Sequence, residues 1–112
     1  MNDFKEFQKW FNFYQAKFGL TGYKVYFKHE PLENSFADIT FNLLDMVATV
    51  RLNSVLLDKD KGHSSSKTSA KHEALHLLVG RLEQNGRYRY TSENELYETT
   101  EELVRKLEGL IE

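Results

Sequence analysis

The segment Lys71-His72-Glu73-Ala74-Leu75-His76 carries the most informative pattern in this chain, two histidines four positions apart with a glutamate after the first. It lies within a stretch, about Ser69 to Gln84, that is rich in apolar residues and is predicted to be helical. On a helix, His72 and His76 lie about 40° apart on one face, so their imidazoles can bind one metal ion together. Glu73 lies about 100° further round and can reach a water molecule at that metal without being a ligand, which is the position of a general base.

The expected metal is zinc, with one ion per chain. Two neutral imidazoles and a carboxylate suit Zn²⁺, with a fourth position left for water, and other divalent metals fit the same ligands. A buried helix that carries two histidines and a glutamate needs polar partners for them, and a metal ion supplies one. The competing interpretation is a pair of core histidines hydrogen-bonded to the backbone or to carboxylates. A metal site without catalytic activity is a further alternative.

A third ligand has to come from elsewhere, and the helix predicted from about Glu93 to Leu110 is dense in carboxylates. Glu101 lies at the margin of the apolar stripe of this helix, where it can face the core. Glu95 has another role available, as the capping-box partner of Ser92. Glu98 lies nearly opposite the core. Glu101 is therefore the preferred third ligand, and Glu95 and Glu98 remain alternatives.

The rest of the chain predicts an α+β fold. Residues 3–18 form an amphipathic helix that ends at Gly19, with aromatic residues recurring at spacings of three and four. Three stretches then alternate with period two, residues 23–28, 36–41 and 46–53, and each reads as a half-buried strand. The loops between them are short, which favours antiparallel neighbours and hence a three-stranded antiparallel meander.

Composition indicates an ordinary globular domain, residues 1–112. Hydrophobic residues make up 40% and charged residues 29%, and there is no Cys, which excludes disulfides and thiolate metal sites. The net charge of −2 argues against general nucleic-acid binding, which depends on an excess of cationic contacts. No apolar run is long enough to span a membrane, and the charged N-terminal residues do not resemble a signal peptide. We therefore expect a cytoplasmic protein without a membrane partner.

The order of a helix, a meander, an H-E-x-x-H helix and a glutamate-bearing helix resembles the minimal gluzincins, which are zincin-like metallopeptidases. It is most similar to small phage- and prophage-encoded metallopeptidases and more distantly to the ImmA/IrrE type. The resemblance covers nearly the whole chain, and its specific part is His72 to His76 with Glu101 to Leu107. The pair Asn94-Glu95 also resembles the ligand segment of larger gluzincins, which keeps Glu95 as an alternative.

The resemblance implies zinc-dependent hydrolysis of peptide bonds in a peptide or protein substrate. His72, His76 and Glu101 would be the zinc ligands and Glu73 the general base. It also implies that an extended substrate pairs with the strand at residues 46–53.

The metal site also suits another class of hydrolase, such as an amidase that acts on non-peptide substrates, and two non-enzymatic classes remain as alternatives. One is a metal-stabilised binding module without activity, and the other is a nucleic-acid-associated factor that uses the cations and aromatics of residues 86–90. Tyr88, Tyr90 and Tyr97 are possible oxyanion donors but are expected to be packing residues. His29 and His63 are possible metal ligands but are expected at the surface.

Overall fold

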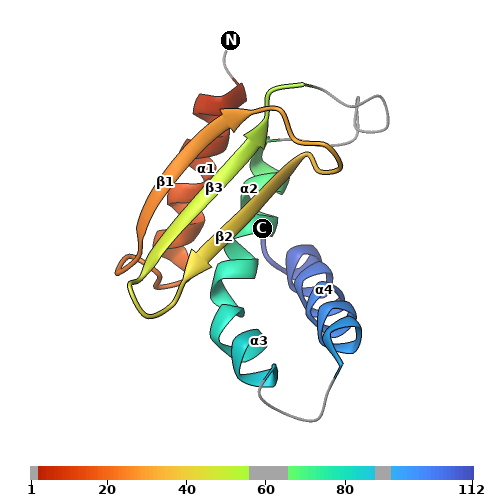
Figure 1. Cartoon of the computed structure of the whole chain (residues 1–112). Helices are drawn as coiled ribbons and strands as arrows, with labels where there is room; N and C mark the ends of the chain where they lie inside the picture. Colours follow the sequence, from red (N-terminus) through yellow and green to blue (C-terminus); the bar gives the residue numbers. More distant parts are fainter. Residues whose placement is uncertain (1–2, 56–65, 88–91) are drawn as a thin grey trace.

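The computed structural model describes residues 3–55, 66–87 and 92–112. In these ranges the elements follow in the order α1 (Asp3–Lys17), β1 (Lys24–Glu30), β2 (Ala37–Asn42), β3 (Val47–Asn53), α2 (Ser66–Leu78), α3 (Gly80–Gly86) and α4 (Glu93–Leu110). Figure 1 shows α1 and α2 on one face of the sheet and α4 beside α2. The predicted α+β architecture is therefore confirmed. None of the described helices is long and apolar enough to cross a membrane.

The strand order of the sheet differs from the prediction. The order is β1-β3-β2, so β3 lies between the other two strands. β1 pairs with β3 in parallel, with Phe27 opposite Val50, whereas β2 pairs with β3 in antiparallel, with Ile39 opposite Val50. The predicted antiparallel meander is therefore wrong, because the sheet is mixed and β1 and β2 are not neighbours.

The loop at residues 31–36 explains this difference. It passes the end of β3, where the buried side chain of Asn53 accepts a hydrogen bond from the Leu32 N–H at 3.1 Å and donates to the Leu32 and Ser35 carbonyls, both at 2.9 Å. Each residue of an extended chain spans about 3.3–3.6 Å and strands lie about 4.8 Å apart, so a short loop can still pass one strand. Short loop length therefore did not require adjacent strands here.

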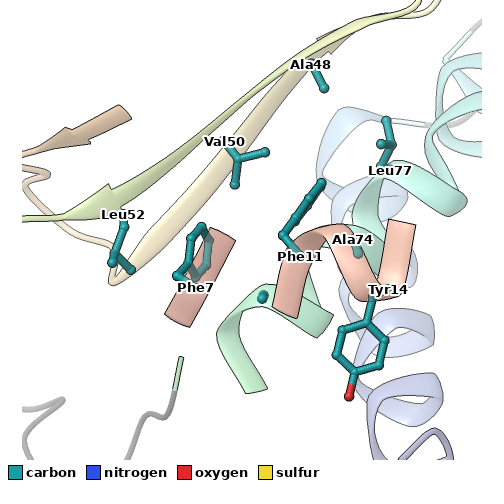
Figure 2. Close-up of a cluster of buried hydrophobic side chains, with 9 residues drawn as sticks. Phe7, Phe11, Tyr14, Ala48, Val50, Leu52, Ala74 and Leu77 are labelled. Atoms are coloured by element: carbon teal, nitrogen blue, oxygen red, sulfur yellow. The ribbon is translucent and has the colours of Figure 1, made fainter. Parts of the chain in front are cut away.

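The main hydrophobic core lies between the sheet and the two helices behind it. The rings of Phe7 and Phe11 on α1 point toward β3, and Tyr14 points away from the sheet (Figure 2), while the small residues Ala70 and Ala74 of α2 belong to the same core. Phe11 meets the ring of Phe27 edge-on, with centroids 5.6 Å apart. The fully or almost fully buried members of this core are Phe7, Phe11, Tyr14, Ala48, Val50, Leu52, Ala70, Ala74 and Leu77.

The helix predicted from Ser69 to Gln84 is two helices in the structure, and it begins earlier, at Ser66. The break falls at Val79, whose φ and ψ of −91° and 5° depart from helical values. Gly80 follows, and the ring of Phe41 lies so close to it that a Cβ there would be 2.6 Å from the ring. Glycine at this position thus allows β2 to pack directly against the junction of α2 and α3.

Helix α4 has the predicted bounds and the predicted start. The Ser92 hydroxyl accepts a hydrogen bond from the Glu95 N–H, and the Glu95 carboxylate accepts one from the Ser92 N–H, which is a complete capping box. Its packing against α2 is slight by comparison with the main core. The buried residues of this second cluster are Leu75, Val79 and Val104.

The C-terminal end of α4 is also held by hydrogen bonds to main-chain oxygens. The Lys71 ammonium donates to the Ile111 oxygen at 2.6 Å, and the Tyr14 hydroxyl donates to the Glu112 oxygen at 2.8 Å. These contacts join α4 to both α2 and α1. The position of α4 along α2 therefore depends on polar contacts as well as on the small apolar cluster.

Candidate metal centre

Three predicted ligand side chains come together where α4 crosses α2. His72 and His76 lie one turn apart on α2, and their Nε2 atoms are 3.2 Å apart. Glu101 reaches them from α4, with Oε2 2.7 Å from His76 Nε2 and Oε1 3.8 Å from His72 Nε2. One ligand atom from each residue lies within 4.8 Å of the others. The structure thus groups the three residues that the sequence analysis preferred as ligands.

These distances fit a tetrahedral zinc ion. Ligand atoms about 2.0–2.1 Å from a tetrahedral zinc are about 3.3 Å from one another. The two Nε2 atoms are 3.2 Å apart, and the two Glu101 oxygens lie 2.7 Å and 3.8 Å from the histidine nitrogens, on either side of that value. Burial lowers the pKa of His76, with the nearby charge of Glu101 opposing the shift, so its imidazole is kept neutral as a metal ligand must be. The donor set of two imidazoles and one carboxylate is also typical of catalytic zinc sites.

The three candidate ligands face an open groove of about 940 Å³. Their side chains retain part of their exposure, 25% for His72, 18% for His76 and 14% for Glu101, so a small molecule or a peptide can reach them. The groove lies between the edge strand β2, the segment from α2 to α3, and α4. Its other lining residues include all of β2 together with Gly80, Glu83, Arg87, Tyr97 and Thr100.

Glu73 lines the same groove but is much more deeply buried, with only 6% of its surface exposed. Among the residues that the structure describes, none donates a hydrogen bond to its carboxylate. Burial raises the pKa of Glu73 to about 8, and the negative charges of Asp38, Glu101 and Glu108 add to the shift. A carboxyl group with this pKa is able both to accept and to release a proton near neutral pH.

The alternative third ligands lie away from the histidines. Glu95 is exposed and is engaged in the capping box with Ser92. Glu98 is exposed as well, and it lines a second hollow on α4 that does not include the two histidines. Of the glutamates considered from the sequence, Glu101 is the one that the structure brings into contact with both imidazoles.

The sheet order corrects the expectation that a substrate pairs with the strand at residues 46–53. β3 is the central strand, and its two edges are occupied by β1 and β2. In this sheet β1 and β2 are the edge strands, and of the two it is β2 that lines the groove. Since an edge strand keeps unpaired backbone groups, β2 takes the place of β3 in this expectation.

Other candidates from the sequence divide into three groups. His29 lies outside the groove and stacks on Phe4, with ring centroids 4.7 Å apart. Tyr97 is 63% exposed and lines the groove, so it is not the packing residue that was expected. His63, Tyr88 and Tyr90 lie outside the described residues, as does most of the segment proposed for nucleic-acid binding.

One contact at the site was missed by the sequence analysis. Glu108 on α4 lies 2.8 Å from Nδ1 of His72, on the side of the ring away from His76. The available signal was the spacing of seven residues between Glu101 and Glu108, which places both carboxylates on nearly the same face of α4.

No family model and no curated protein matches this chain. Among solved structures, the chain is similar to the metallopeptidase zymogen jannalysin of Methanocaldococcus jannaschii. The sequence identity is 19%, the TM-score is 0.43, and the match covers 95% of this chain and 91% of that one. The resemblance to gluzincins stays a prediction.

Proposed function

We propose that this protein is a zinc-dependent metallopeptidase in which His72, His76 and Glu101 hold the metal and Glu73 is the general base. The observation that carries the proposal is the grouping of three ligand atoms within 4.8 Å, in a groove that also contains a buried carboxyl group. A site built only for structure would have four protein ligands and no opening. Among the residues that the structure describes, three candidate ligands cluster here, and they face an accessible groove.

The proposed roles follow from the position of each side chain. A zinc ion at the three ligands would supply Lewis acidity toward a carbonyl oxygen and toward water. Glu73 follows His72 on α2 and faces the same groove, so its carboxylate can take a proton from the attacking water and pass it to the leaving amine. A divalent cation beside Glu73 favours its charged form, which prepares it as the base.

A peptide is the substrate class that suits this groove. β2 runs along one wall from Ala37 to Asn42, and within the described residues its outer edge is not paired with another strand. An extended peptide can form backbone hydrogen bonds with such an edge, and its carbonyl groups then pass close to the candidate metal ligands. The partner proposed for this protein is therefore a peptide or an extended segment of a protein.

The first experiment measures the metal content of protein purified without a His-tag or chelator. We expect about one zinc per chain in the wild type, none in His72→Ala and strongly reduced zinc in Glu101→Ala. Glu98→Ala is the matched control, because it removes one carboxylate from an exposed position of the same helix. A wild type that neither contains nor takes up zinc at micromolar concentration contradicts the proposal.

The second experiment separates a peptidase from a metal-stabilised binding module. Glu73→Gln keeps the size of the side chain and leaves the three ligands in place, so it should still bind zinc. If Glu73 is the base, hydrolysis of a diverse peptide library should fall by about 10²-fold or more in this variant. Equal hydrolysis by wild type and Glu73→Gln would contradict the role of Glu73 as the base, and no hydrolysis by either zinc-loaded protein would favour the binding module.

A further inference from the structure

We propose that Glu108 is a positioning residue that fixes the tautomer and the orientation of the His72 ring. This inference rests on the proposed metal site and concerns a residue outside the ligand set. The Glu108 carboxylate lies 2.8 Å from His72 Nδ1, and its side chain is only 21% exposed. A short contact of this kind between a carboxylate and a ring nitrogen is a hydrogen bond with the ring as donor.

The contact determines which nitrogen of His72 can bind a metal. When Nδ1 carries the proton and donates it to Glu108, Nε2 of the neutral ring keeps its lone pair. That Nε2 is the atom that faces His76 Nε2 at 3.2 Å and Glu101 at 3.8 Å. The ring is therefore prepared for the metal before any metal arrives.

The two histidines differ in this respect. His76 Nε2 lies 2.7 Å from the Glu101 carboxylate, so in the metal-free protein it is the natural donor to that oxygen. Within the described residues no carboxylate contacts His76 Nδ1. His76 has to give up its Nε2 proton to bind a metal, whereas His72 has the required tautomer already. This asymmetry makes His72 the first of the two imidazoles to be ready as a ligand.

Glu108 acts through His72 and not as a ligand itself. Nδ1 and Nε2 point away from the imidazole ring in different directions, so a carboxylate held at Nδ1 lies away from the metal position at Nε2. The three ligand atoms that cluster within 4.8 Å accordingly come from His72, His76 and Glu101, without Glu108. A carboxylate that receives the second N–H of a metal-binding histidine typically fixes the ring and increases metal affinity.

The packing of α4 against α2 places Glu108 next to His72. Glu101 and Glu108 lie two turns apart on nearly the same face of α4, and they contact His76 and His72 respectively, so the two helices run antiparallel. Just beyond Glu108, the Ile111 oxygen accepts the hydrogen bond from Lys71, which is the residue before His72. A shift of α4 by one turn would break the Lys71 contact and both histidine contacts together.

The first test compares zinc affinity in Glu108→Ala, Glu108→Gln and Glu98→Ala, measured by competition with a chromophoric chelator. Each Ala variant removes one negative charge from α4, so their difference excludes a general electrostatic effect. We expect Glu108→Ala to weaken zinc binding about 10- to 100-fold, Glu108→Gln to lie between it and the wild type, and Glu98→Ala to stay near the wild type. An equal loss in Glu108→Ala and Glu98→Ala overturns the proposal.

The second test reads the tautomer of His72 directly in the metal-free protein. Long-range ¹H–¹⁵N NMR, at a pH where imidazoles are neutral, should show His72 protonated at Nδ1 in the wild type. In Glu108→Ala, and to a smaller degree in Glu108→Gln, the Nε2-protonated form should gain population. A wild-type His72 protonated at Nε2 overturns the inference. Because this measurement needs no zinc, it still decides the role of Glu108 if the wild type proves not to bind metal and the proposed function fails.

Discussion

The two helices that form the candidate metal centre belong to differently packed regions. α2 is part of the main body, where fully buried aromatic residues of α1 fill the space between the helices and the sheet. α4 rests on α2 through a much smaller cluster of Leu75, Val79 and Val104. The partly buried side chains of Leu103 and Leu107 add to this cluster, and polar contacts to the C-terminal end of α4 and to Glu101 and Glu108 also hold the helix. The candidate site therefore lies at the boundary between a strongly packed region and a lightly packed one.

This difference indicates how the site is assembled. His72, His76 and Glu73 are carried by a helix whose position is set by the main core, so their geometry depends on global stability. Glu101 is carried by a helix that can open at a lower free-energy cost, because few buried apolar contacts hold it. We therefore expect the pair of histidines to be the stable part of the site, and the third ligand to be the part that is completed when α4 docks.

The largest loss of folding stability is expected from a substitution in the main body. Phe11→Ala removes a fully buried ring and should lower the free energy of unfolding by about 3–5 kcal/mol, a large share of the stability of a small domain. Urea denaturation followed by circular dichroism measures this loss. Phe13→Ala is the matched control on the same helix, because its ring is 48% exposed, and should cost less than about 1 kcal/mol. Equal losses in the two variants would contradict the core described here.

Zinc binding should reduce the difference in local stability between the main body and α4. At a free concentration 100 times its Kd, the metal should stabilise the folded state by about 2.7 kcal/mol, and His76→Ala should abolish this gain. Hydrogen exchange followed by mass spectrometry should show the largest added protection in residues 92–112 and a smaller change in residues 3–17. Added protection spread evenly over both segments would mean that α4 is already as firmly held as α1.

The sequence predicts the bounds of two of the helices well but not the order of the strands. The bounds of the first and last helices, 3–18 and 93–110, agree with α1 and α4 to within a residue, because amphipathic periodicity reports which face of a helix is buried. Strand order could not be predicted in this way. Period-two alternation reports the face that each strand buries but not its neighbours, and the side-chain contacts of Asn53 that carry the loop past β3 leave no periodic signal.

In the candidate site, too, the features set by local helix geometry could be predicted, and those set by tertiary packing could not. The shared face of His72 and His76 comes from local helix geometry, so the spacing alone predicts it. Glu101 could be ranked above Glu95 and Glu98 only by its position at the edge of the apolar stripe, and the structure groups Glu101 with the histidines. The contact of Glu108 with His72 depends on how α4 slides along α2, which is a property of tertiary packing that a single helix pattern does not contain.

The smallest of the expected effects concerns the hydrogen bond that joins α1 to the end of α4. Burial raises the pKa of Tyr14, so its phenol stays protonated and donates to the Glu112 oxygen at 2.8 Å. Tyr14→Phe keeps the buried ring but loses this bond, and should lower stability by about 1 kcal/mol. Tyr26→Phe, on the exposed side of β1, should change stability by less than half as much. If α4 is the lightly held region, hydrogen exchange in Tyr14→Phe should accelerate in residues 92–112 and remain unchanged in β3; faster exchange in both would place this bond in the main core instead.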